Sequence, residues 1–323
     1  GKCRGCIMGK MQHAPKRSFT SVTSKVGEHL HVDIIFIKNL NGLKTPYLIC
    51  VEECSGFLHL IKLNSKNKVI NGLLMIILWY KSYKHQVEYI HSDSEAVFKK
   101  SENDLMKSGI HMEFSSPGDH EVFAERAVRS LKDKVRSTIY DLPFRLPYSL
   151  YSYLFMHVAM NMNDTPNSKT GTSKTPRGMV MGIMEPGRHI KSYFGMLVLA
   201  HEINRKDDMD AKSNFGIVIG RELFSTSVKV LNLDTLHVCI RNNIEEVKIT
   251  NEAIAFINSI ADKGPIAIID DIFTDDKKEL PLAPNLNNFE NTISNDDDAM
   301  NYHENEFEKS ENNIINNKNI ESN

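Results

Sequence analysis

The sequence predicts an α/β protein built on a mixed sheet with helices on both faces, followed by a small all-β module and a largely disordered tail. Two observations carry this prediction. Residues 21–164 alternate short segments rich in β-branched residues with longer apolar segments of helical length. Short strand-like segments then return over 190–250, after a polar stretch at 165–189 that we interpret as a linker.

The first three strands are expected over 30–37, 47–51 and 57–63. The first is a run of Leu, Val, Ile and Phe around a single Asp, and Asn41-Gly42 follows it as a turn signal. Ser55-Gly56 separates the second strand from the third. Three consecutive strands joined by such short turns indicate an antiparallel meander.

The next elements alternate between helix and strand. In chain order we expect a helix over 68–84, a strand over 87–91, a helix over 95–108, a strand over 111–115, and helices through much of 121–163. Crossover helices between strands place helices on the faces of the sheet. The order β-β-β-α-β-α-β-α-α fits the RNase H-like fold, although order alone is a weak argument.

Beyond the linker, the spacing of short apolar runs predicts the strands of the β module. These are 196–200, 215–219, 228–231 and 236–240. Residues 251–323 are expected to be an acidic, Asn-rich and largely disordered tail, because too few apolar groups remain there to offset the entropy of ordering.

The net charge of −2 over 323 residues is unevenly distributed. Residues 270–323 carry fourteen acidic and four basic side chains, so their net charge is −10 and that of residues 1–269 is −2 + 10 = +8. A basic body with an acidic tail is compatible with nucleic-acid binding. An ordinary domain with a solvated tail would have the same distribution.

Composition also argues against a membrane or secreted protein. The longest uncharged apolar run is Val69–Tyr80, twelve residues against the roughly 20 that span a bilayer, and no secretory signal opens the chain. Five cysteines form no disulfide framework. We therefore expect no membrane partner and a reduced, intracellular location. The start at Gly-Lys-Cys suggests a fragment of a longer chain.

Two acidic residues lie at unusual places in the predicted strands. Asp33 is inside the first strand, where Asp is depleted, and Asp93 ends the fourth. If these strands pair in parallel, the two carboxylates are adjacent and repel each other unless a cation lies between them. Hard oxygen ligands suit Mg²⁺ or Mn²⁺. Taken singly, each Asp is better explained as a strand-end cap or turn residue.

A third acid lies on the helix that follows the fifth strand. Four apolar residues recur there at helical spacing and predict its buried stripe: Ala124, Val128, Leu131 and Val135. Glu125 shares another face with three cations: Arg129, Lys132 and Arg136. A metal-binding carboxylate followed by cations that contact DNA phosphates would produce this pattern, and so would a solvated amphipathic helix. Glu121 is a weaker alternative third acid.

These motifs together resemble the integrase region of copia-type (Pseudoviridae) LTR retrotransposon polyproteins. The similar segments are Cys3-Arg-Gly-Cys6-Ile-Met-Gly-Lys10, His29-Leu-His-Val-Asp33, Tyr89-Ile-His-Ser-Asp93, Phe114-Ser-Ser-Pro-Gly118 with Phe123-Ala-Glu125-Arg126, and Phe194-Gly-Met through Val238-Cys-Ile-Arg241. The resemblance covers roughly residues 1–250.

The resemblance implies a polynucleotidyl transferase that joins cDNA 3′ ends to target DNA. Asp33, Asp93 and Glu125 would be catalytic and would hold two Mg²⁺ or Mn²⁺ ions. DNA would contact the helix through Arg129, Lys132 and Arg136. A homo-oligomer acting in the nucleus and cytoplasm is implied as well.

At the N-terminus, residues 1–20 resemble the end of a zinc-binding pre-integrase module. Cys3 and Cys6 supply two of the four ligands that a tetrahedral Zn²⁺ needs, and the family's two histidines lie further upstream. We therefore expect an incomplete zinc site. The thirteen histidines of the chain show no His-x-x-x-His spacing, and His91 is interpreted as a strand-end polar residue.

The sequence also departs from the family pattern. Ser94-Glu-Ala-Val-Phe98 stands where the family usually has Asn-Gly-x-Glu-Phe, and Asp119-His-Glu-Val122 stands in place of a Gln-Asn-Gly loop. Asp93 and Glu125 enclose thirty-one residues rather than the family's usual thirty-five. Two alternatives therefore stay open: a degenerate or domesticated relative that binds nucleic acid without catalysis, and a stand-alone RNase H-like nuclease.

Overall fold

A computed structural model describes residues 25–38, 44–115, 122–182, 192–201, 209, 211–222, 225–262 and 269–270. The chain divides into two compact units, 1–276 and 277–323, and every described residue belongs to the first. Three candidate site residues lie outside the described ranges: Cys3, Cys6 and Glu121. The same is true of the tail from residue 271 onward.

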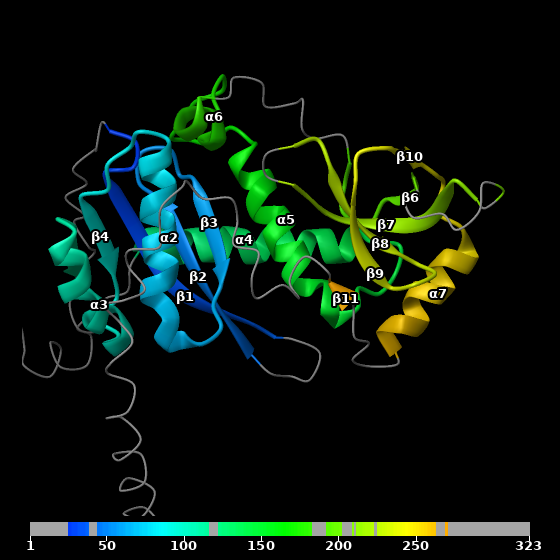
Figure 1. Ribbon diagram of the computed structural model, residues 1–323, viewed down its shortest axis with the longest axis horizontal. Helices are drawn as coiled ribbons and strands as arrows, with labels where there is room; N and C mark the ends of the chain where they lie inside the picture. Colours follow the sequence, from blue (N-terminus) through cyan, green and yellow to red (C-terminus); the bar gives the residue numbers. More distant parts are fainter. Residues whose placement is uncertain are drawn as a thin grey trace, which may run out of the picture. The chain divides into compact units, whose positions relative to one another are not determined.

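The first sheet contains five strands in the order β3-β2-β1-β4-β5 (Figure 1). They are β1 His29–Lys38, β2 Lys44–Glu52, β3 Leu58–Lys62, β4 Tyr89–Ser92 and β5 His111–Phe114. The pairs β1–β2 and β2–β3 are antiparallel, whereas β4 is parallel to both β1 and β5. This is the mixed sheet of the RNase H-like fold, so the predicted fold class is confirmed.

Helices cover both faces of this sheet, as predicted. One layer contains η1 Lys66–Lys68, α2 Val69–Ser82 and α3 Ala96–Lys107, and the other contains α4 Val122–Asp141, η2 Tyr148–Leu150 and α5 Tyr151–Asn163. Figure 1 shows α2 in front of the strands and α4 behind them. The alternation of side chains along β1 explains the two layers, because Leu30 and Val32 pack with α2 while Ile35 and Ile37 pack with α4 and α5.

The second sheet has six strands in the order β10-β6-β7-β8-β9-β11. Its strands are β6 Leu197–His201, β7 Ser213–Arg221, β8 Val228–Asn232, β9 His237–Arg241, β10 Ile244–Glu246 and β11 Ile269–Asp270. All pairs are antiparallel except β9–β11. The four predicted strands are present, and β10 and β11 add two that the sequence pattern did not predict.

Two predicted boundaries need correction. The tail predicted from residue 251 begins with a helix, α7 Asn251–Asp262, because Ile257 and Ile260 at helical spacing are 1% and 4% exposed. This helix follows the predicted β module of 190–250, in which every described element is a strand. The predicted linker contains a short helix, α6 Pro176–Met181, whose N-cap Thr175 accepts a hydrogen bond from the Gly178 N–H at 3.0 Å.

The two sheets share one hydrophobic core. Ile217 and Leu231 of the second sheet belong to the same buried cluster as Leu154 and Phe155 of α5. This continuity means that residues before and after the predicted linker bury apolar surface against each other.

A buried polar group adds to this contact. The Asp164 carboxylate, at the end of α5, pairs with Arg177 of α6 and, at 2.9 Å, with Arg221 of β7. All three side chains are buried. One carboxylate thus joins α6 to β7, a strand of the second sheet.

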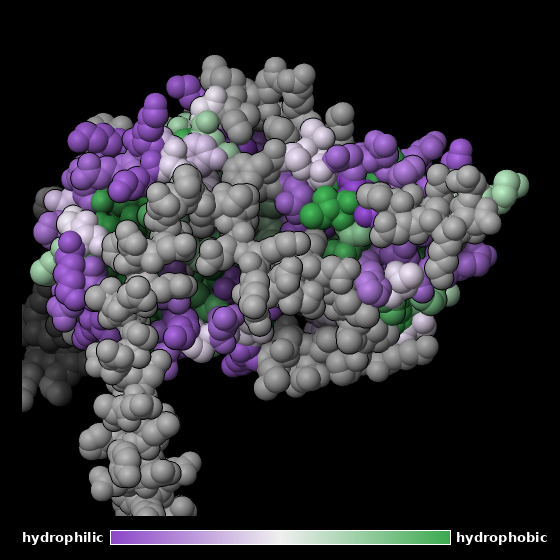
Figure 2. Space-filling model, in the orientation of Figure 1, coloured by the Kyte–Doolittle hydropathy of each residue, from purple (hydrophilic) through white to green (hydrophobic). Residues whose placement is uncertain are grey.

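Hydrophilic side chains dominate the face seen in Figure 2, and the described hydrophobic ones show as small patches between them. Among the described helices, none is both long enough and apolar enough to cross a membrane.

Candidate functional site

Strand register brings Asp33 and Asp93 to the same level of the sheet. The parallel pair β1–β4 aligns His31 with His91, an offset of 91 − 31 = 60 residues. The same offset aligns Asp33 with Asp93, which follows the last residue of β4. Adjacent strands lie about 4.8 Å apart, so neighbouring positions bring their side chains close together.

Asp33 carries the electrostatic signature of a crowded acidic site. The pKa of Asp33 is raised from 3.8 to about 6: burial is the largest cause, a hydrogen bond from the Ile34 N–H opposes it, and the charges of Asp93, Glu95 and Glu125 add to the rise. That bond reaches Asp33 Oδ1 at 2.7 Å. Three further carboxyl groups thus act on Asp33 through their charges, but among the described residues no three of these four acids place ligand oxygens within 4.8 Å of one another. Such a group holds protons or cations more readily than isolated carboxylates do.

Asp93 is oriented by a short backbone turn. Its Oδ1 accepts a hydrogen bond from the Glu95 N–H at 3.2 Å, the bond that shapes an Asx turn between β4 and α3. The turn leads into α3, so the side chain sits where a strand ends and a helix begins. Positions of this kind commonly carry binding residues in sheet proteins.

Glu125 reaches the acidic group from α4. The predicted stripe of this helix is buried at Ala124, Leu131 and Val135, and Val128 packs partly buried against the same core. The stripe seats α4 on β1 and β2. Glu125 is exposed in the first turn, and its charge acts on Asp33. The helix thus brings a third carboxylate to the strand ends.

Glu95 is the acidic neighbour that sequence reasoning missed. Its charge also raises the pKa of Asp33, but its Oε2 lies 2.7 Å from the Lys66 Nζ. An ion pair with lysine already partly neutralises this carboxylate. Its position two residues after Asp93 was the available signal, yet it fell in a segment that differs from the family pattern.

The three predicted DNA-contacting cations are exposed along α4: Arg129, Lys132 and Arg136. Arg136 pairs with Asp133 at 3.1 Å, an exposed i,i+3 contact within the helix. The basic face therefore begins one turn after Glu125 and continues along the outer side of α4.

Histidines share this face of the sheet, which the sequence analysis did not foresee. His29 and His31 alternate with their neighbours along β1, so they lie on the same side as Asp33. His31 stacks on Phe123 of α4, with ring centroids 4.3 Å apart. His91 lies two residues before Asp93 and stacks on His31, with centroids 4.6 Å apart. The signal was present as two His-x-Asp segments with equal offset.

No protein-family profile matches this chain, and no curated protein matches it. Solved structures similar to it include a chain of the simian T-cell lymphotropic virus intasome in complex with PP2A regulatory subunit B56 gamma, with a TM-score of 0.44, 12% identity, and coverage of 77% of this chain and 88% of that one.

Two isolated integrase catalytic cores are similar as well. The HTLV-2 core in complex with magnesium has a TM-score of 0.37 and 15% identity over 48% of this chain and 96% of that one. The BIV core has a TM-score of 0.36 and 20% identity over 48% and 95%. All three TM-scores are below 0.5, so these likenesses by themselves assign no function to this chain.

Proposed function

We propose that this protein is a copia-type retrotransposon integrase that joins element cDNA 3′ ends to target DNA. The observation that carries the proposal is that Asp93 and Glu125 act through their charges on Asp33, whose pKa is raised first by burial and then by these neighbouring acids. Three carboxylates on a β-strand, a strand end and a helix form a hard oxygen donor set, which suits Mg²⁺ or Mn²⁺.

The chain's own residues hold and orient the reacting groups. Asp33, Asp93 and Glu125 would hold the ions. When bound, two such ions activate the attacking oxygen and stabilise the leaving oxygen of a phosphodiester. Bound cations would offset the repulsion among these carboxylates and would therefore favour their ionised forms.

The proposed reaction proceeds in two balanced displacements. In the first, a water oxygen forms a bond to a phosphorus near the cDNA 3′ end, and the bond from that phosphorus to the 3′ oxygen of the retained strand breaks. The retained 3′ oxygen takes a proton and becomes the new 3′-OH, and the released nucleotides carry the 5′ phosphate. In the second, the new 3′-OH forms a bond to a target-DNA phosphorus, and a target 3′ oxygen leaves with a proton. Arg129, Lys132 and Arg136 would contact the neighbouring phosphates of the DNA.

A strand-transfer assay tests the proposal with a labelled cDNA-end oligonucleotide, target DNA and Mg²⁺ or Mn²⁺. Asp33→Asn, Asp93→Asn and Glu125→Gln should each abolish joining. Asp133→Asn is the matched control, because it removes an exposed carboxylate from the same helix as Glu125 and should retain activity.

The alternative functions predict different outcomes of the same assay. Hydrolysis without joining would identify an RNase H-like nuclease. DNA binding without either reaction would identify a degenerate or domesticated relative. Loss of joining in Glu95→Gln but not in Glu125→Gln would move the third metal ligand to α3.

Further parts of the proposal concern the whole protein. We infer an oligomer when it is active, action in the nucleus and cytoplasm, and Zn²⁺ binding at Cys3 and Cys6 only with ligands from further upstream. Two thiolates do not close a tetrahedral site. Tight stoichiometric zinc at Cys3 and Cys6 of this chain as a monomer would contradict that part.

A further inference from the structure

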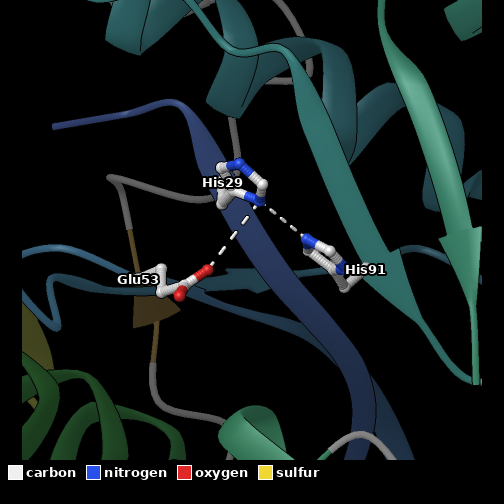
Figure 3. A group of neighbouring side chains, drawn as sticks. All are labelled: His29, Glu53 and His91. Atoms are coloured by element: carbon white, nitrogen blue, oxygen red, sulfur yellow. Dashed lines mark hydrogen bonds and ion pairs between the residues drawn. The ribbon is translucent and has the colours of Figure 1, made fainter. Parts of the chain in front are cut away.

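We propose that His29, His91 and Glu53 form a binding site for Zn²⁺, separate from the carboxylate group at Asp33. Figure 3 shows the three side chains pointing toward one another from β1, β4 and the end of β2. One ligand atom from each lies within 4.8 Å of the others. His29 Nδ1 is 2.9 Å from His91 Nε2 and 3.8 Å from Glu53 Oε2.

These separations are close to those of a zinc site. Bonds of about 2.1 Å in a tetrahedral site place neighbouring ligand atoms about 3.4 Å apart. The nitrogen pair must therefore open slightly, and the nitrogen–oxygen pair must close slightly. Two histidines and one glutamate leave a fourth position for water, an arrangement that zinc proteins use.

A second set of contacts supports the site from outside. Glu113 Oε2 lies 3.1 Å from His91 Nδ1, which is the nitrogen that faces away from His29. If His91 donates its Nδ1–H to this carboxylate, its Nε2 lone pair faces the proposed ion. Metal-bound histidines usually have such a carboxylate partner, which sets the tautomer and increases ligand basicity.

Glu53 is held in a similar way. His31 Nε2 lies 3.2 Å from Glu53 Oε2 and fixes the direction of the carboxylate.

Without an ion, His29 Nδ1–H can donate to His91 Nε2. In neutral His29, the proton moves to Nε2 when Nδ1 binds the ion, so the charge of the ring is unchanged.

The site is also rigid and half-enclosed before any ion binds. The side chains of His29, Glu53 and His91 are 14%, 11% and 19% exposed. The His29 ring stacks on Tyr89 and on His91, with centroids 4.6 and 5.2 Å apart. Little side-chain entropy is left to lose on binding, which favours affinity.

Ligand chemistry separates this site from the carboxylates. Imidazole suits Zn²⁺ and similar ions, whereas Mg²⁺ prefers oxygen. His91 and Asp93 are two residues apart, about 7 Å along an extended chain. The same strands would therefore hold a softer ion at His29 and His91, on the N-terminal side of Asp33 and Asp93. Bound zinc would link β1, β4 and the end of β2 there.

Zinc titration of the full chain carrying Cys3→Ser and Cys6→Ser tests the proposal, since these changes remove the N-terminal thiolates. In competition with a chromophoric chelator, one Zn²⁺ per chain should bind tightly and stay bound in excess Mg²⁺. His29→Gln and His91→Gln should each lower the affinity at least about 100-fold. Glu113→Gln should lower it about 10–100-fold, because it removes only the supporting carboxylate.

Two controls make the outcome decisive. His111→Gln removes an exposed histidine from the adjacent strand β5 and should leave zinc affinity unchanged. Asp33→Asn should also leave it unchanged, which separates this site from the proposed catalytic one. Equal affinity in the His91→Gln protein, or loss of zinc in Asp33→Asn, would overturn the proposal.

Cobalt substitution provides a measurement that does not depend on the histidine variants folding. Co²⁺ added to the Cys3→Ser, Cys6→Ser chain should give the visible bands of a tetrahedral or five-coordinate site without a thiolate charge-transfer band. A spectrum of octahedral Co²⁺ would overturn the proposal and leave the histidines as a hydrogen-bonded stack.

Discussion

Asp33 places a carboxylate where burial and three other acids oppose its ionisation. Its folded pKa of about 6 lies above the ordinary value of 3.8. Between these values the folded state binds more protons than the unfolded state, so stability falls as pH rises from about 4 to 6 and stays lower above that. A shift of this size corresponds to about 2–3 kcal/mol.

Asp33→Asn should therefore stabilise the metal-free protein at neutral pH. The amide keeps an oxygen acceptor for the Ile34 N–H but carries no charge to repel Asp93. We expect the unfolding free energy to rise by about 1–3 kcal/mol above pH 7 and to change little near pH 4. Urea unfolding in EDTA across this pH range measures it. An unchanged pH profile would show that Asp33 is not a strained acid.

Magnesium should reverse that effect in the natural protein. An ion that binds only the folded state stabilises it by about 2.7 kcal/mol at a hundred times its dissociation constant. We expect Mg²⁺ to raise the melting temperature of the natural chain and to leave that of Asp33→Asn nearly unchanged. Thermal unfolding with increasing Mg²⁺ measures both. Equal gains in the two proteins would place the ion elsewhere.

At the scale of elements, α4 combines a buried stripe with an exposed basic face. Leu131 and Val135 seat the helix on the sheet, and this seating directs Glu125 to the strand ends and leaves Lys132 exposed. The same helix can therefore contribute a metal ligand and phosphate contacts. Both roles use exposed side chains, so the buried stripe of α4 stays packed on the sheet in either.

Lys132→Glu should weaken DNA binding for all sequences and reduce the salt slope of log affinity by about 1, because one phosphate contact is lost. Stability should change by no more than about 0.5 kcal/mol. Lys134→Glu is the matched control, since it makes the same charge change about 200° around the helix. Filter binding over a salt series measures both variants. Equal slopes and affinities in Lys132→Glu and the natural chain would remove this face from the DNA interface.

At the scale of the whole described molecule, the two sheets are held together by a shared hydrophobic core and a buried ion cluster. Asp164 neutralises part of the charge of two buried guanidinium groups, Arg177 and Arg221. Removing this carboxylate would leave both cations buried without their partner. The contact between α5, α6 and β7 is thus sensitive to a single substitution.

Asp164→Ala should destabilise the protein by about 3–5 kcal/mol. Asp262→Ala is the control: it breaks an exposed pair, Arg145–Asp262 at 2.5 Å, and should change stability by less than about 1 kcal/mol. Chemical unfolding of the two variants compares them directly. A similar small loss in both would mean that the buried cluster contributes little to the contact between the sheets.

The local pattern of the sequence was enough to predict the strands of the first sheet, and the helices that cover it, to within a few residues. Alternation of β-branched residues around Asp33, and the helical spacing from Ala124 to Val135, are properties of consecutive residues. Backbone geometry turns each pattern directly into a face. The predicted fold class followed from the order of these elements.

The boundary after residue 250 could not be predicted in this way. Residues 251–262 form a helix because Ile257 and Ile260 bury against the rest of the fold, whereas the acidic, Asn-rich composition further along the chain led to the prediction of a tail. The two-residue strand β11 is ordered by pairing with β9. Both depend on a surface supplied by distant residues.

The candidate sites divide along the same line. The sequence by itself determined that Asp33 lies inside a strand, that Asp93 ends another strand, and that Glu125 lies on the helix after the fifth strand. Only the tertiary structure brought Glu95 to Asp33 and gathered His29, His91 and Glu53 together. Those contacts join residues 24 to 62 positions apart, and such separations are bridged by strand pairing and packing, which no local pattern encodes.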